Sequence, residues 1–342
     1  MTRRVTRQDV ALRAGVSGAA VSVVLNGARG NIRIAPETRD RIIAAARELD
    51  YVANTSAQDL RRQRSLTLGV VGPPPPRTTY QQVIGYQLSY FIRTMANRRG
   101  YEVFEVAEHE AETPHENPVR TLANRAVAGI LVVSNRHHVA ELRALLSGGM
   151  PMVQLLRPQL GRRCPSVVVD PRSGIAQAVA HLAGLGHRRI AYVGSGSAHV
   201  TDRGRFEAFR DAMGENGIAL PERFVRLQDY GLDFGAAALR ALLAYRRAPT
   251  AVLCGADVLA LGVLRAAYEA RVRVPEDLSV ISYDDVLAGG LYTALTAVSQ
   301  PLQAVAERSV EALVERIEGV RSRAAVVLPT RLVVRESTAP PG

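Results

Sequence analysis

From residue 65 onward, short apolar runs alternate with longer stretches of helical periodicity. The runs are rich in Val, Ile and Leu, so each is expected to be a strand that is buried on both faces. The expected strands are 66–71, 101–106, 129–133, 152–155, 167–169, 189–193, 224–227, 251–254, 278–282, 295–298 and 325–334. The expected helices between them include 81–99, 173–185, 205–216, 235–243, 257–270 and 302–317.

This alternation predicts an α/β fold with doubly wound parallel sheets. Because this number of strands is too large for one compact sheet of this type, we expect two similar lobes with a boundary near 169–170. Ligands in such folds bind beyond the carboxyl ends of the strands, which in a two-lobed body places them between the lobes.

Residues 5–27 show a different pattern, which predicts two short helices joined by a tight turn. Thr6 can cap the first helix, with Asp9 as the reciprocal acceptor. Gly15 can end that helix because glycine adopts positive φ without strain, and Ser17 can cap the second. A third helix is expected from Pro36, with an apolar stripe of Thr38, Ile42, Ile43, Ala46 and Leu49.

Three helices in so short a segment make a minimal helix-turn-helix head, which places one helix in a DNA major groove. An ordinary α-hairpin in a larger helical domain is the alternative. Charge favours DNA: the 342-residue chain carries +11, and all 43 of its basic residues are Arg. Residues 1–64 hold 12 Arg against 6 acids. A basic head on a milder body is typical of proteins that bind the phosphate backbone.

Other features exclude several classes of protein. No apolar run approaches the ~20 residues that span a membrane, and no secretory leader is evident, so we expect a soluble cytoplasmic protein with no membrane partner. Cys164 and Cys254 lie in apolar contexts and are expected to be buried thiols rather than a disulfide or metal site. The chain has no Walker A motif, G-x-S-x-G elbow or metal-spaced His cluster. We therefore expect no catalytic residue, metal or cofactor, and we do not expect the protein to be an enzyme.

Residues 52–65 connect the head to the body. Asn54 can cap a helix of about two turns that places Ala57 and Leu60 on one face. Such a helix is too short to be stable alone and needs a partner, either its own copy in a dimer or DNA. On composition alone, a solvated linker is the simpler interpretation.

Polar and aromatic side chains follow several expected strands. Tyr80, Asp257 and the run Tyr283-Asp284-Asp285 come after strands, and Arg205 opens a helix. A carboxylate opposite a guanidinium, with a Tyr face nearby, suits a sugar or polyol. The alternative for each is a helix cap or a surface pair, and Asp257 is well placed to cap its own helix.

The order of these parts resembles the LacI/GalR family of bacterial transcriptional regulators over nearly the whole chain. The motifs that carry the resemblance share both sequence and order: Val5-Thr-(x)2-Asp-Val-Ala-(x)2-Ala-Gly-Val-Ser17, Val21-Ser, Leu25-Asn-Gly27, Glu37-Thr-Arg39, Leu49-Asp-Tyr-Val-Ala-Asn54, Leu185-Gly-His-Arg-Arg-Ile-Ala-Tyr-Val-Gly194, Leu278-Ser-Val-Ile-Ser-Tyr-Asp-Asp285 and Leu295-Thr-(x)3-Gln300-Pro.

The resemblance implies a homodimer whose two heads bind halves of a pseudo-palindromic operator in double-stranded DNA. The linker becomes a hinge helix that folds on DNA, and Leu60 wedges into a base step from the minor groove. The phosphate contacts of the family fall on Thr6, Ser17, Ser22 and Asn26, its groove-reading positions on Gly18, Ala19 and Val23, and its hinge contacts on Asn54, Ala57 and Leu60. The loop 28–34 is longer than in many members, and its Arg29 and Arg33 are expected as extra phosphate contacts. The effector contacts of the family fall on Tyr80, Arg205, Tyr230, Asp257 and Gln300.

The chain also departs from the family. The first positions of the recognition helix and a position one turn on usually carry groove-reading polar side chains, but here they are Gly18, Ala19 and Val23. Direct readout is therefore expected to use thymine methyl groups, close backbone approach and Arg residues of the arm. Ala53 replaces a Pro before the hinge, and Ala256 replaces the common Asn before the effector Asp. No heptad tail of the kind that forms tetramers is seen.

We therefore expect a sequence-specific transcriptional regulator, most simply a repressor, whose operator affinity is modulated allosterically by a sugar or sugar-like effector. The alternative is a bilobal solute-binding protein with no transcriptional role. The expected domains are a head at 1–53, a hinge at 54–64 and a two-lobed, periplasmic-binding-protein-like effector-binding body. Its first lobe is expected at 65–169 with 300–321, and its second at 170–299 with 322–338.

Overall fold

The structure is a computed structural model that describes residues 5–26, 34–51, 65–72, 83–110, 113, 116–133, 137–156, 160–161, 163–196, 200–228, 230–320 and 325–342. The chain divides into two compact units, Met1–Leu66 and Thr67–Gly342.

The described part of the first unit contains three helices, α1 (Arg7–Ala14), α2 (Gly18–Asn26) and α3 (Pro36–Glu48). They pack around Val10, Val21 and Ile42, which are fully buried. Among the described residues no single helix is long and apolar enough to cross a membrane, and only α1 and α2 taken together, despite a bend of 103° between them, meet that test of length and composition.

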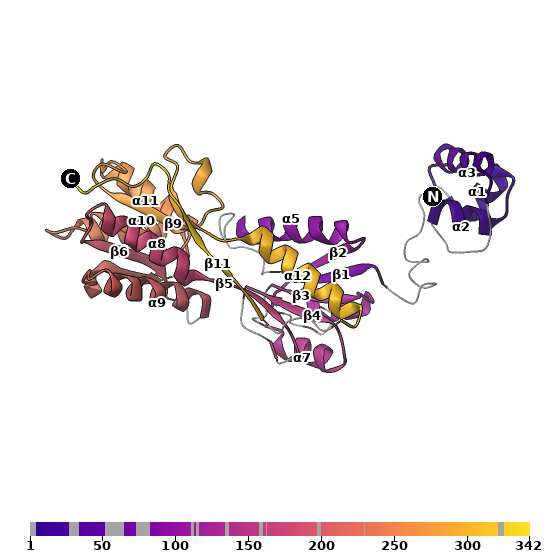
Figure 1. Ribbon diagram of the computed structural model, residues 1–342, viewed down its shortest axis with the longest axis horizontal. Helices are drawn as coiled ribbons and strands as arrows, with labels where there is room; N and C mark the ends of the chain where they lie inside the picture. The colour runs from indigo at the N-terminus through magenta and orange to yellow at the C-terminus, as the bar shows by residue number, and fades with distance from the viewer. Residues whose placement is uncertain are drawn as a thin grey trace. The chain divides into compact units, whose positions relative to one another are not determined.

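The second unit contains two six-stranded sheets (Figure 1). The first has the strand order β11-β5-β4-β3-β1-β2, and every pairing in it is parallel. Its strands are β1 (Thr67–Gly72), β2 (Glu102–Ala107), β3 (Gly129–Val132), β4 (Met152–Leu155), β5 (Ser166–Asp170) and β11 (Ala325–Pro329).

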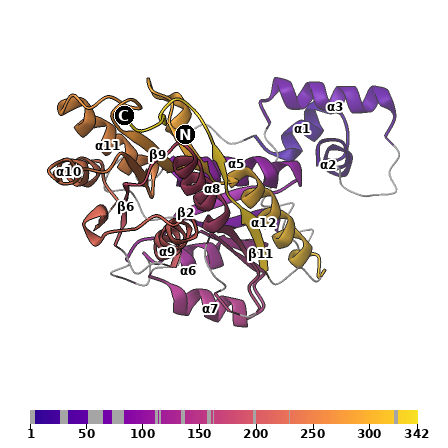
Figure 2. The same cartoon turned by 60° about the vertical axis from the view of Figure 1, so that its left-hand side comes forward.

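Helices cover both faces of the first sheet because its strands are apolar on both sides. Leu131 and Val153 point to one face with α5 (Val83–Arg98) and α12 (Leu302–Ile317), which lie side by side (Figures 1 and 2). Ile130 and Met152, one residue away along each strand, point to the other face. The helices packed there are α6 (Pro118–Asn124) and α7 (Val139–Ser147).

The second sheet has the order β12-β10-β9-β8-β6-β7 and repeats this arrangement. Its strands are β6 (Ile190–Ser195), β7 (Val225–Gln228), β8 (Ala251–Cys254), β9 (Ser279–Asp284), β10 (Thr296–Ser299) and β12 (Arg331–Val333). The predicted parallel sheet is confirmed except at one edge, where β12 runs antiparallel to β10. The chain enters β12 directly from β11, with Thr330 alone between them.

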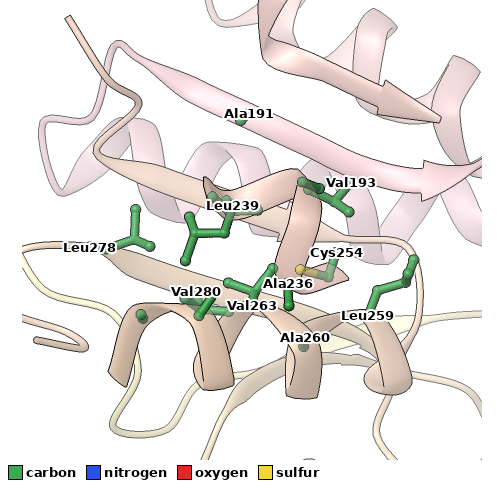
Figure 3. Close-up of a cluster of buried hydrophobic side chains, with 14 of the residues drawn as sticks. Ala191, Val193, Ala236, Leu239, Cys254, Leu259, Ala260, Val263, Leu278 and Val280 are labelled. Carbon is green, nitrogen blue, oxygen red and sulfur yellow. The ribbon is translucent and has the colours of Figure 1, made fainter. Parts of the chain in front are cut away.

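The helices of the second lobe also lie on both faces. Val252 and Val280 pack with α10 (Leu232–Leu243) and α11 (Asp257–Glu269) in the cluster shown in Figure 3. Leu253 and Ile281 face the opposite way, toward α8 (Pro171–Gly184) and α9 (Val200–Glu215). This pattern, in which neighbouring residues of one strand reach opposite cores, is why these runs are apolar throughout.

Within the described residues the chain passes between the lobes at Asp170–Pro171, at Ser299–Leu302 and at Thr330. Thr330 ties two of these crossings together: its hydroxyl donates to the carbonyl of Asp170 over 2.9 Å and accepts from the backbone N–H of Gly174 over 2.9 Å. The expected assignment of 322–338 to the second lobe needs correction, because Ala325–Pro329 pairs with β5 in the first sheet.

Candidate functional site

The start of α1 has the geometry that the sequence predicts. The hydroxyl of Thr6 accepts from the backbone N–H of Asp9 at 3.4 Å, and the carboxylate of Asp9 accepts from the backbone N–H of Thr6 at 2.7 Å. Gly15 ends the helix with φ 66°. This capping box and glycine stop fix where α1 begins and where the turn to α2 starts.

The second helix is capped by Ser17, whose Oγ accepts from the backbone N–H of Ala20 at 3.2 Å. Ala19 is exposed and Val23 is half-buried, so the start of this helix presents small, mostly apolar groups to any partner. Ser22 is only 5% exposed, and its Oγ accepts from Nη1 of Arg7 at 3.1 Å. Its hydroxyl hydrogen stays available as a donor.

Several predicted contact residues lie outside the described part of the chain. They are Arg29, Asn54, Ala57, Leu60 and Tyr80, together with the side chain of Asn26. Their assigned roles stay predictions.

A polar cluster lies in the second lobe, at the carboxyl ends of β8 and β9. Asp257 is 4% exposed, and its Oδ2 accepts from the backbone N–H groups of Val286 and Leu287, both at 2.8 Å. Its Oδ1 is buried and has no hydrogen-bond partner among the described residues. Asp257 does not cap its own helix: the N-cap of α11 is Ala256, which makes no side-chain hydrogen bond. Asp257 instead holds the loop after β9.

Arg205 contacts the segment that leads to Asp257. Its Nη1 donates to the carbonyl of Gly255 at 2.7 Å and to the hydroxyl of Tyr230 at 3.3 Å. Its guanidinium carbon lies 4.0 Å from the ring centre of Tyr283, a cation–π contact. Arg205 was expected to open its helix, but α9 begins at Val200, so Arg205 is in the second turn.

Asp284 connects the remaining members of the cluster. Its Oδ1 accepts from Nε2 of Gln300 at 2.8 Å and lies 3.5 Å from Nη2 of Arg205. Burial raises the pKa of Asp284 to about 7, against the lowering effect of the Arg205 charge; the neighbouring Asp257 adds to the increase. The Arg205 pair alone does not fully compensate for the desolvation of this carboxylate.

The structure therefore brings four predicted effector residues together: Arg205, Tyr230, Asp257 and Gln300. The predicted set did not include Asp284, which joins two of them. Its position directly after an expected strand was the available signal. The sequence could not show that Arg205 and Gln300, from distant segments, both reach it.

No group of three or more His, Cys, Asp or Glu side chains among the described residues is placed to hold a metal ion. Cys164 and Cys254 are buried free thiols, and burial raises the pKa of both, that of Cys164 to about 11. Protonated thiols are poor nucleophiles and poor metal ligands.

A helix-turn-helix unit in the same chain as a two-lobed α/β body defines a class of DNA-binding regulators that respond to a ligand. Comparison with known proteins gives the same result. Residues 6–54 match the model of the bacterial regulatory proteins of the lacI family, and residues 179–338 match a periplasmic binding protein-like domain.

Full-length relatives extend the similarity. The chain is 32% identical to the HTH-type transcriptional repressor PurR of Erwinia tasmaniensis, covering 98% of this chain and 97% of that protein. It is also 32% identical to the HTH-type transcriptional regulator CelR of Thermobifida fusca, over 98% of both chains. The chain belongs to the LacI family of transcriptional regulators and is not an enzyme.

Solved structures agree with this assignment. A lac repressor dimer bound to operator and the anti-inducer ONPF has a TM-score of 0.80 at 28% identity, covering 98% of this chain and all of that one. A complex of CelR with cellobiose has a TM-score of 0.70 at 30% identity with the same coverage. The match of the head to the family does not support the alternative of a solute-binding protein without a transcriptional role.

Proposed function

We propose that the protein is a homodimeric repressor that binds a pseudo-palindromic operator and whose affinity for it is set by a sugar or sugar-like effector. The observation that carries the effector assignment is the buried Oδ1 of Asp257, which lacks a hydrogen-bond partner among the described residues. A buried carboxylate oxygen without a donor is costly, so the site is incomplete until a hydroxyl or amine reaches it.

The neighbouring groups match a polyhydroxylated ligand. Asp257 supplies an acceptor, and Arg205 supplies a fixed guanidinium that is already oriented by Gly255 and Tyr283. Tyr230 adds an aromatic face that can stack on a sugar ring. The CelR complex, 30% identical to this chain, holds cellobiose, which supports a sugar over other classes of small molecule.

On the DNA side, we propose that the hydroxyls of Thr6, Ser17 and Ser22 and the amide of Asn26 contact phosphates, which fix the register of the head on the duplex. Gly18, Ala19 and Val23 bring the helix close to the bases. Arg29 adds a phosphate contact.

We further propose that residues 54–64 form a hinge helix in which Leu60 enters the minor groove, with contacts from Asn54 and Ala57. In this proposal the effector acts by linkage. A ligand that prefers one relative position of the lobes shifts the dimer toward or away from the spacing at which both hinge helices fold on DNA. The bending that Leu60 causes then contributes to operator choice. Since its target is genomic DNA, the protein is expected to act in the cytoplasm.

The proposal is tested by selecting bound sequences from random duplex DNA with the purified full-length protein, with and without a panel of sugars that includes cellobiose. We expect a pseudo-palindromic site and a change in affinity with at least one sugar. Salt-insensitive binding, or no binding under any condition, would contradict the DNA assignment. Operator binding that no sugar changes would contradict only the effector class.

The hinge is tested separately by Leu60→Ala. Losing the apolar wedge is expected to weaken operator binding at least tenfold, because the DNA bend loses its support, while sugar binding stays unchanged. The matched control is Leu227→Ala, which removes a partly exposed leucine (41%) from β7 in the body. Fluorescence anisotropy with operator DNA measures the first effect and calorimetric titration the second. Equal losses of DNA and sugar affinity would contradict this division of roles.

A further inference from the structure

The recognition helix α2 carries almost no group that can read a base. Its sequence, GAAVSVVLN, has no charged residue, and its polar side chains are Ser22 and Asn26. Ser22 is 5% exposed and accepts a hydrogen bond from Arg7. Discrimination of guanine from other bases in the major groove needs donors directed at O6 and N7, and α2 itself has no side chain of the usual kind.

Arg7 places such a donor against this helix. It is the first residue of α1, and its Nη1 donates to Oγ of Ser22 over 3.1 Å. A Cβ atom built on Gly18 would lie 3.3 Å from Nε of Arg7 and 3.8 Å from both Cζ and Nη2. The guanidinium of Arg7 therefore lies beside the first turn of α2, next to the place where the Cβ atom of a larger residue at position 18 would be.

The position of Arg7 is not explained by the stability of α1. A cation in the first turn of a helix faces the positive end of the helix dipole, which is unfavourable. Arg13, in the last turn of the same helix, has the favourable placement and pairs with Glu48 over 2.7 Å. Among the described residues no ion pair includes Arg7, and the hydrogen bond to Ser22 uses only part of its five N–H donors.

We propose that Arg7 is the base-reading residue of this head: it reads a guanine in each half-site through O6 and N7, in place of the side chain that Gly18 lacks. Ser22 holds the guanidinium across the helix–helix junction, and Gly18 leaves room for it. This rests on the proposed binding of the head to the major groove, and it adds a specific contact that the apolar start of α2 does not provide.

The test compares the full-length protein with Arg7→Met and Arg7→Lys in selection from random duplex DNA. Wild type is expected to select a guanine at one symmetric position that both variants lose. Replacing that guanine with 7-deazaguanine in the selected operator removes N7, and should weaken wild-type binding about 5- to 150-fold with little effect on Arg7→Met. Arg7→Lys keeps the charge, so retention of the preference by Arg7→Lys would contradict bidentate reading.

Two matched variants separate this role from charge and from packing. Arg13→Met removes the same charge from the same helix and should leave the base preference unchanged. Gly18→Leu should displace the guanidinium and remove the guanine preference, and adding Arg7→Met to it should change the preference no further.

Three results would overturn the proposal. A uniform loss of affinity across sequences, with a salt slope lower by about one, would assign Arg7 to a phosphate. A lower melting temperature of the head with an unchanged base preference would leave only a structural role. An unchanged preference with unchanged stability would remove Arg7 from the interface. Absence of any selective DNA binding by the wild type would instead contradict the proposed function, so the two failures are distinguishable.

Discussion

The two lobes of the body share a strand order but use the carboxyl ends of their strands differently. In the first lobe, buried polar side chains there bind backbone: Glu108 accepts from the N–H of His137 at 2.8 Å, and Gln154 donates to the carbonyl of Val132 at 2.8 Å. In the second lobe, Arg205 and Asp284 interact with each other, and Asp257 binds backbone N–H groups through Oδ2 only, so that its Oδ1 has no donor among the described residues.

This difference separates scaffold from site within one architecture. A side chain that satisfies a backbone group stabilises a loop and has little capacity left for a ligand. A buried ion pair and an unsatisfied oxygen still have hydrogen-bonding groups that a ligand can use, and burying such groups is costly until a specific partner binds them. The same topology therefore supports a structural edge in one lobe and a candidate recognition site in the other.

The largest expected effect concerns how tightly the second lobe is built. A Cβ on Gly262 would overlap the carbonyl oxygen of Leu232 and lie 2.8 Å from the backbone N of Ala236. Both atoms belong to the backbone of α10, which cannot easily move. Gly262→Ala is therefore expected to destabilise the body by about 3 kcal/mol. Gly69→Ala in the first lobe meets mainly the side chain of Leu122, at 3.1 Å, which can move.

We expect Gly69→Ala to cost about 1 kcal/mol. Thermal unfolding of both variants, followed by circular dichroism, measures the difference. Equal shifts of the two melting temperatures would show that the α10–α11 contact is no tighter than the packing of the first lobe.

The inner strands were predictable because they are buried on both faces, so their apolar runs stop close to where the strands do. The expectation that every strand is buried on both faces is wrong at the sheet edges, where β2, β7 and β11 are half-buried or exposed. One run misled: 325–334 was expected as a single strand, but it is divided at Thr330 into β11 and β12, which belong to different sheets. Apolar pattern cannot show this division, because it depends on the hydrogen bonds of Thr330 to Asp170 and Gly174.

The sequence could name residues that the structure brings together but not the contacts between them, and the role of these residues in effector binding stays a prediction. Arg205, Tyr230 and Gln300 were expected from the family resemblance, and the structure brings them together. Asp284 was missed as the residue that joins two of them, since the link requires β9 to lie beside β8 and the crossing segment after β10 to fold back on it. Long-range contacts of this kind leave no local pattern in the sequence.

A smaller effect is expected from a substitution that keeps one oxygen of Asp257 and replaces the other. Asp257→Asn can keep one oxygen as acceptor for the N–H groups of Val286 and Leu287, but it replaces the unpartnered oxygen with a donor. We expect sugar affinity to fall about 10- to 150-fold with little change in melting temperature. Asp257→Ala should lower both, because the loop N–H groups also lose their acceptor. The measurements are calorimetric titration with the sugar found by selection and thermal unfolding; unchanged affinity of Asp257→Asn would contradict the proposed hydroxyl contact.

The last prediction concerns pH and the Arg205–Asp284 pair. Because burial raises the pKa of Asp284 to about 7 from a usual value near 4, the native state holds a proton that the unfolded state releases between these values. The free energy of unfolding should therefore decrease as pH rises from about 4 to 7, and this contribution is fully present only below the unfolded pKa. The Arg205 charge lowers the pKa of Asp284 and the Asp257 charge raises it, so the variant used for comparison must keep both residues.

Asp284→Asn removes the titrating group but keeps an acceptor for Gln300, so the stability of this variant should fall less steeply over the same pH range. Chemical unfolding of wild type and variant at matched ionic strength measures the two slopes. Parallel slopes would mean that Asp284 is ionised in the folded protein over this range. The second lobe would then contain a fully compensated ion pair, and its polar groups would be as well satisfied as those of the first lobe.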